Sequence, residues 1–87
     1  MVEEKYSLNT RWVKVEKIMV EVFKTNVYEE QQSALLVEKL LYHYPHWRIN
    51  FDLEDCDKIL RVEGDSICNE KIIEFLNAIG FECTVLN

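Results

Sequence analysis

Apolar and polar residues alternate most regularly in the middle of the chain. Trp47, Ile49, Phe51 and Leu53 are separated by single polar residues, a period of two that is typical of a strand with one buried and one solvated face. A polar turn follows, and residues 58–63 form a second apolar run. Together these segments predict a β-hairpin.

Two further segments have the composition of strands. Residues 18–26 carry apolar side chains on both faces, which favours a central strand. Residues 81–86 predict the last strand, and Gly80 precedes them where a left-handed helix cap is expected. We expect Met19, Phe23 and Ile59 to point away from the helices.

The remaining apolar residues follow a helical period. Residues 29–44 predict a helix with a stripe formed by Ala34, Val37, Leu41 and Tyr44, widened by Leu36 and Leu40. Pro45 ends this helix. A second helix is expected over residues 70–79, capped by Asn69 or Ser66. The residues of this helix expected to face inward are Ile72, Ile73, Leu76 and Ile79.

The order strand, helix, strand, strand, helix, strand predicts an α+β fold of the ferredoxin-like type. In this βαββαβ arrangement a four-stranded antiparallel sheet carries both helices on one face. The first strand-helix junction, the hairpin turn and the Gly80–Phe81 turn then meet at one end. The other end gathers residues 44–46 and 64–69.

The 87 residues predict one small domain, which we place at residues 18–87, with residues 1–17 as a partly ordered N-terminal extension. Tyr6, Leu8 and Trp12 make this extension too apolar for a free tail. It forms either a short helix capped by Asn9 or an extended arm over the sheet. The open sheet face is covered either by this arm or by a second copy, so the chain is expected to be a monomer or a weak homodimer.

The formal net charge is −6, and residues 18–87 hold six basic and thirteen acidic residues. Such a domain repels phosphate backbones and anionic lipids, which disfavours nucleic acid and membrane partners and allows a basic protein or a cation. The chain has neither an apolar run long enough to span a bilayer nor the apolar core of a signal peptide. We therefore expect a cytoplasmic protein.

The three cysteines are Cys56, Cys68 and Cys83. Their odd number and the lack of a CxxC spacing indicate reduced thiols. The sequence contains no paired acid and base with a pocket, no nucleophile with a positioned histidine and no glycine-rich phosphate loop. We expect neither an enzyme nor a cofactor.

Five segments together are similar to the heavy-metal-associated domain family, which includes small copper chaperones and the N-terminal modules of metal-pumping ATPases. They are VEKLL at 37–41, residues 47–53, VEGD at 62–65, KIIE at 71–74, and Gly80–Phe81. The resemblance covers residues 18–87 and implies the same ferredoxin-like fold.

Members of that family bind a soft metal such as Cu(I) through two thiolates of a CxxC motif at the start of the first helix. Counting back from Val37, the two ligand positions fall on Glu30 and Ser33. A carboxylate and a hydroxyl do not replace two thiolates. The resemblance therefore implies the fold without the family's metal transfer.

The end that holds metal in the family is acidic in this chain. Its candidate partner-binding residues are Glu29, Glu30, Glu54, Asp55, Asp57 and Phe81, with Cys56 among them. Three interpretations stay open: a solvated polar turn, a docking face for a basic partner, or a loose site for a hard cation. At the other end His43, His46 and Cys68 are ligand types for zinc or copper, although Pro45 breaks the helical spacing between the two histidines.

These observations predict a non-enzymatic interaction module with no bound metal. The first alternative is a metal-binding or metallochaperone-like domain with a degenerate site that uses Glu30, Ser33 and Cys56, or an unforeseen set of cysteine and histidine ligands. A second alternative is a regulatory domain that pairs edge to edge and senses a small molecule at the seam.

Overall fold

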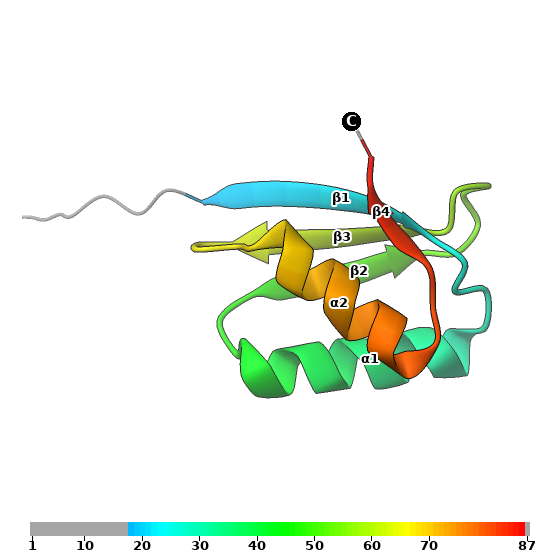
Figure 1. The fold of residues 1–87 in the computed structure, drawn as a ribbon, viewed down its shortest axis with the longest axis horizontal. Coiled ribbons are helices and arrows are strands. Elements are labelled where there is room, and N and C mark those ends of the chain that lie inside the picture. The colour runs from blue at the N-terminus through cyan, green and yellow to red at the C-terminus, as the bar shows by residue number, and fades with distance from the viewer. Residues whose placement is uncertain (1–17, 87) are drawn as a thin grey trace, which may run out of the picture.

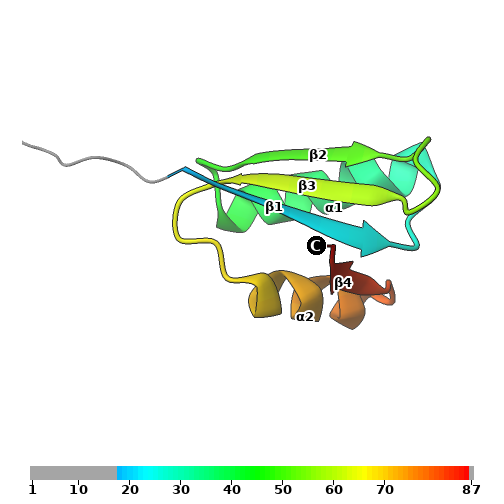
Figure 2. The same cartoon turned by 90° about the horizontal axis from the view of Figure 1, so that it is seen from above.

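The computed structural model describes residues 18–86. The elements are β1 (Met19–Thr25), α1 (Glu30–His43), β2 (Arg48–Asp52), β3 (Ile59–Gly64), α2 (Asn69–Ile79) and β4 (Cys83–Val85). The strands form one antiparallel sheet in the order β2-β3-β1-β4 (Figure 2), and both helices lie on the same face of it (Figure 1). The predicted α+β fold is confirmed, while the N-terminal extension predicted for residues 1–17 lies outside the described residues.

Strand β1 is central, as predicted, but its inner face is not the expected one. Phe23 pairs with Leu60 of β3, and both side chains are fully buried, whereas Val20 is 46% exposed. The expectation that Phe23 points outward is therefore wrong. Both faces of β1 are apolar, so only the pairing with β3 decides which face packs against the helices. Ile59 lies on the open face, as expected, because its neighbour Leu60 points inward.

Each helix covers the sheet with the side chains that the helical period groups together. In α1 the buried residues are Leu36 and Leu40. The sequence predicted that these two residues only widen the apolar stripe, but they form its centre. Ala34, predicted to belong to the stripe, is exposed. In α2 the buried residues are Ile72 and Leu76, whereas Ile79 is 40% exposed, so the expectation that it faces inward is wrong. Leu40, Ile72 and Leu76 belong to one core with buried residues of the sheet, Phe23, Leu60 and Val62 among them. Burial of these apolar side chains stabilises the packing of the helices on the sheet.

The predicted N-terminal cap of α2 is wrong, and its predicted C-terminal cap is confirmed. The residue before the helix is Cys68 and no side chain caps it, so the expected caps at Ser66 and Asn69 are wrong. Gly80 has φ of 111°, and its N–H donates to the carbonyl groups of Leu76 and Asn77, which confirms the left-handed C-cap.

The hairpin also follows its alternation, since Trp47 and Ile49 are buried. Three connections meet at one end of the sheet, as predicted. The Thr25 N–H donates to Asp57 O at 3.1 Å, and the Glu82 N–H donates to the Asn26 side chain at 2.8 Å. Residues distant in the sequence are thereby brought to the end where β1 runs into α1.

Candidate functional site at the acidic end

The turn between β2 and β3 is held by its own aspartates. Asp52 Oδ1 accepts the Glu54 N–H at 3.2 Å, and Asp55 Oδ1 accepts the Asp57 N–H at 2.8 Å. Aspartates favour such turns because their short carboxylates reach backbone donors two residues ahead. Lys58 closes the turn with φ of 48°, and its N–H donates to Asp55 O at 2.9 Å.

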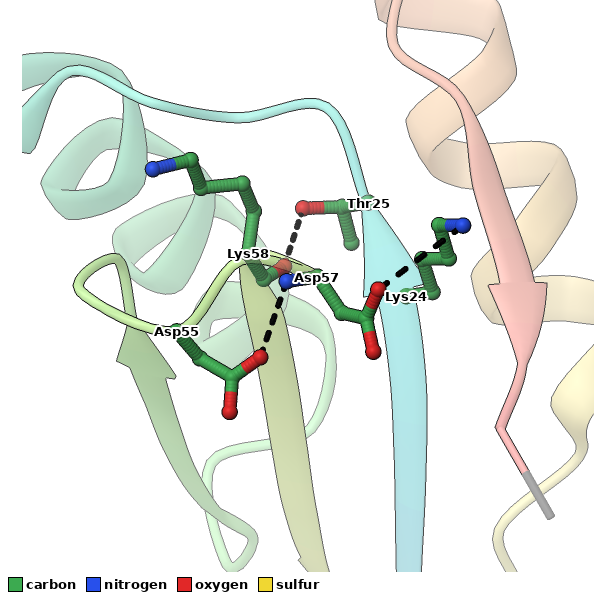
Figure 3. A network of polar contacts seen from close by, with 5 residues as sticks. All are labelled: Lys24, Thr25, Asp55, Asp57 and Lys58. Atoms are coloured by element: carbon green, nitrogen blue, oxygen red, sulfur yellow. Dashed lines mark hydrogen bonds and ion pairs between the residues drawn. The ribbon is translucent and has the colours of Figure 1, made fainter.

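Thr25 fastens this turn to β1 (Figure 3). Its hydroxyl donates to Lys58 O at 2.6 Å and accepts the Val27 N–H at 3.2 Å. Thr25 is buried with 6% of its surface exposed, so these bonds are shielded from water and satisfy its buried hydroxyl. Uncharged groups therefore fix the position of the turn relative to β1 and α1.

The turn, the end of β2 and the first turn of α1 enclose a hollow of about 470 Å³, which we call the acidic hollow. Its lining residues are Glu30, Ser33, Phe51, Asp52, Leu53 and Glu54. Two of these residues, Phe51 and Leu53, are half-buried and apolar, while the three carboxylate residues are exposed. Ser33 Oγ donates to Glu30 O at 2.8 Å, so this hydroxyl is already engaged within the helix.

The acidic hollow brings together Glu30, Ser33 and Glu54, three of the residues singled out in the sequence. It adds Asp52, which the strand pattern placed only on the solvated face of β2. Glu29 is exposed next to it, and its carbonyl accepts the Ser33 N–H at 3.0 Å. Phe81 does not line the hollow; it is partly buried against the core.

Basic side chains neutralise only part of the negative charge at the acidic end. The Lys24 ammonium lies 3.7 Å from the Asp57 carboxylate, and Lys58 Nζ donates to Leu53 O at 2.8 Å. Among residues 18–86, Glu30 and Glu54 have no basic side chain within ion-pair distance. Within the part of the chain that the structure describes, no ion pair compensates the negative charge of the acidic hollow.

A different group of side chains gathers at the tip of the turn. Ligand atoms of Asp55, Cys56 and Asp57 lie within 4.8 Å of one another. Asp55 already accepts a backbone N–H, and Asp57 pairs with Lys24. Cys56 does not line the hollow with Glu30 and Ser33, so the structure does not bring together the set that a degenerate family site would use.

The second candidate metal set also stays dispersed. Within the described residues only the Asp55–Asp57 tip brings three potential ligands together, so His43, His46 and Cys68 do not converge. The His43 ring instead makes an edge contact with Phe75, with 6.0 Å between ring centroids. Cys83 is buried in the core, and burial raises the pKa of its thiol to about 11, which keeps it protonated and unreactive at neutral pH.

None of the protein-family models, curated proteins or solved structures with which the chain was compared matches it. Among residues 18–86, no helix has the length and apolar composition needed to cross a membrane.

Proposed function

We propose that this domain is a non-enzymatic interaction module of the heavy-metal-associated type, and that the acidic hollow receives a lysine or arginine side chain of a basic partner. The observation that supports this proposal is that exposed carboxylates and half-buried apolar side chains line the same hollow. Lysine and arginine have long aliphatic stems that cover apolar surface while their charged ends remain at a polar rim. Phe51 and Leu53 offer that surface, and Glu30 and Glu54 offer the rim.

The charge distribution supports the same partner. Carboxylates gathered at one end of a small domain steer a basic molecule toward that end and set its orientation. The turn that carries Glu54 is fastened to β1 by the Thr25 hydroxyl. The hollow is therefore formed before a partner arrives, which lowers the entropy lost on binding.

We place this interaction in the cytoplasm. All three cysteines are free, and two of them, Cys56 and Cys68, are exposed. Exposed unpaired thiols are typical of proteins kept in a reducing compartment.

The test is a proton-nitrogen NMR titration of the full chain with the peptide acetyl-Gly-Arg-Arg-Gly-amide at low ionic strength. We expect saturable shifts at Glu30, Ser33 and Glu54 that weaken as salt is added, because exposed charges are screened within about 10 Å at 0.1 M salt. The double substitution Glu30→Gln and Glu54→Gln should remove the shifts. The matched control is Glu74→Gln, which removes a carboxylate from the exposed surface of α2.

Two results would contradict the proposal. One is an equal loss of binding in the Glu74→Gln control, which would mean that only the overall charge matters. The other is a set of peptide shifts spread over all exposed carboxylates without saturation.

A cation site is the second candidate, and the cluster of Asp55, Cys56 and Asp57 is the observation that favours it. A thiolate with carboxylates suits Zn²⁺ better than Ca²⁺. Titration with Zn²⁺ should then shift the signals of residues 55–57 at one equivalent, and Cys56→Ser should abolish the effect while leaving peptide binding unchanged. A spectrum unaffected by Zn²⁺ removes this candidate.

A further inference from the structure

Strand β2 forms an outer edge of the sheet. In the order β2-β3-β1-β4 the two outer strands are β2, with five residues, and β4, with three (Figure 2). All five residues of β2 pair with β3 in one unbroken register, so the strand has no bulge that would turn its outer edge away. Among residues 18–86 no strand pairs with that edge. Its outward N–H and C=O groups are therefore open to a further strand.

The side chains of β2 are complementary to a reversed copy of the same strand. Arg48 begins the strand, Asn50 is its middle residue and Asp52 ends it. When two copies of β2 lie antiparallel with Asn50 opposite Asn50, Arg48 of each copy faces Asp52 of the other. Opposite charges placed directly across an antiparallel pair stabilise it, and like charges destabilise it. This pairing therefore contains two attractive pairs related by a two-fold axis.

The neighbouring registers lack this complementarity. A shift by one residue would place the helices of the two copies on opposite faces of the joined sheet, because the side-chain period of a strand is two. A shift by two residues places Arg48 or Asp52 opposite Asn50 and leaves no pair of opposite charges between strand residues. Only the register centred on Asn50 pairs all five residues of β2 and both of its charges.

An apolar hollow lies beside the same edge. It encloses about 520 Å³ and is lined by residues of α1, Val37 and Leu41 among them, and by Ile49, Asn50 and Phe51 of β2. Val37, Leu41 and Phe51 are half-buried, so each keeps apolar surface in contact with solvent. In the register centred on Asn50, Ile49 of one copy lies opposite Phe51 of the other, on the face that the helices cover. The pairing thus removes apolar surface from water, which favours association.

The charges at the two ends of β2 are available for this contact. Arg48 and Asp52 are exposed, and no ion pair within residues 18–86 involves either of them. Asp52 Oδ1 accepts the Glu54 N–H at 3.2 Å, so Oδ2 can accept a guanidinium N–H. Hydrogen bonds between a guanidinium and a carboxylate are among the stronger ones in proteins.

From these observations we infer that two copies of this chain pair through antiparallel β2 edges, with Asn50 at the two-fold axis and Arg48 of each copy against Asp52 of the other. The two four-stranded sheets then form one continuous sheet with all helices on one face. The net charge of −6 on each copy opposes association, so the dimer forms at high protein concentration. This inference does not rest on the binding of a basic partner in the acidic hollow.

The first test measures the mass of the full chain by light scattering at concentrations up to about 1 mM, a range that detects weak association. We expect an equilibrium between monomer and dimer. Arg48→Asp places two pairs of like charges across the axis and should weaken the dimer by about tenfold or more. The matched control Lys71→Asp changes the net charge by the same amount on the exposed surface of α2 and should have a much smaller effect.

A mixture of two variants tests the register. Asp52→Arg should also be monomeric, because Arg48 then faces an arginine. In a mixture of Arg48→Asp with Asp52→Arg, however, every charge at these positions lies opposite one of the other sign. We therefore expect the mixture to dimerise although neither variant does so alone. The double variant that carries both substitutions should dimerise by itself, and circular dichroism checks that each variant is folded.

Isotope-filtered NMR on mixed labelled and unlabelled wild-type chains identifies the surface without any substitution. We expect nuclear Overhauser contacts between the Ile49 methyl groups of one copy and the Phe51 ring of the other. The double substitution Glu30→Gln and Glu54→Gln, which should remove peptide binding, should leave these contacts in place. A failure of the proposed function is thereby distinguishable from a failure of this inference.

Four outcomes would overturn the inference. One is a wild-type chain that stays monomeric throughout the concentration range. Another is an equal weakening of the dimer by Arg48→Asp and Lys71→Asp, which would mean that only the overall charge matters. Filtered contacts from β4 or from the helices alone would assign the dimer to another surface. Folded single variants that stay monomeric when mixed would rule out the register centred on Asn50.

Discussion

The two ends of the domain are held together in different ways. At the aromatic end, which we define by Tyr44, Trp47, Gly64 and Asp65, side chains contact one another directly. The rings of Tyr44 and Trp47 stack with 3.8 Å between centroids and 6° between planes, and Trp47 Nε1 donates to Asp65 O at 3.0 Å. At the acidic end, backbone bonds, the carboxylates of Asp52 and Asp55 and the Thr25 hydroxyl fix the turn, and no hydrogen bond or ion pair within residues 18–86 joins the Glu30 or Glu54 carboxylate to it.

The two ends therefore differ in role: side chains at the aromatic end hold the fold, whereas the Glu30 and Glu54 carboxylates at the acidic end are free to bind. At the aromatic end the Trp47 N–H already donates to Asp65 O, so a ligand that took up this N–H would have to break an existing contact. The carboxylates of the acidic hollow are exposed and have no ion-pair partner within residues 18–86. We therefore expect substitutions at the aromatic end to change stability and substitutions in the acidic hollow to change binding.

The largest effect is expected at Trp47. Replacing this buried ring by alanine removes its packing, its stack on Tyr44 and its bond to Asp65, and should lower the free energy of unfolding by about 3–5 kcal/mol. Urea denaturation followed by far-ultraviolet circular dichroism measures the loss. The matched control is Tyr28→Ala, because Tyr28 is an aromatic residue between β1 and α1 that is 66% exposed. An equal loss of stability in this control would contradict the assignment of a structural role to the aromatic end.

Gly64→Ala should have the next largest effect. A Cβ atom at Gly64 would lie 2.3 Å from Trp47 Cδ1, so the indole has to move, at a loss of about 1–3 kcal/mol. In a Trp47→Ala background the same substitution should cost much less, because the two sites are coupled through this contact. Urea denaturation of the wild type, the two single variants and the double variant measures this coupling. An equal loss in both backgrounds would show that the contact with Trp47 is not the reason why Gly64→Ala is destabilising.

Thr25 tests the fastening of the acidic end. Thr25→Val keeps the shape of the side chain but leaves Lys58 O and the Val27 N–H without a partner, which should cost about 1–2 kcal/mol. The NMR signals of residues 55–58 should shift at the same time. Thr84→Val, on the exposed side of β4, provides the control. Unchanged signals of the turn would mean that its backbone bonds hold it without Thr25.

The strands illustrate what a sequence pattern determines. Residues 47–53 alternate strictly, so one face of β2 is apolar and its orientation is predictable. In β1 both faces are apolar, and the position of Phe23 follows only from its pairing with Leu60. The start of α2 was mispredicted for a related reason: Ser66 and Asn69 both have suitable side chains, yet neither caps the helix that follows Cys68.

The candidate site shows the same division. The element order was sufficient to predict that the turn after β2 and the start of α1 meet at one end, because antiparallel pairing dictates which connections share an end. It was not sufficient to predict the hollow. Asp52 belongs to it and Phe81 does not, because these outcomes depend on where β2 ends and where β4 begins, and the sequence defines those boundaries poorly.

The smallest effect on stability is expected in the acidic hollow. Glu30→Gln and Glu54→Gln together should change the free energy of unfolding by less than about 0.5 kcal/mol, because exposed side chains away from structural contacts contribute little. Because the two substitutions remove repulsion among carboxylates, they favour a slight increase in the free energy of unfolding. Denaturation at low and at high salt separates the salt-dependent repulsion between carboxylates from the effect of the lost side-chain contacts. A large loss of stability would show that Glu30 or Glu54 holds the fold together, whereas unchanged stability combined with lost binding of the arginine peptide assigns the two carboxylates to a partner.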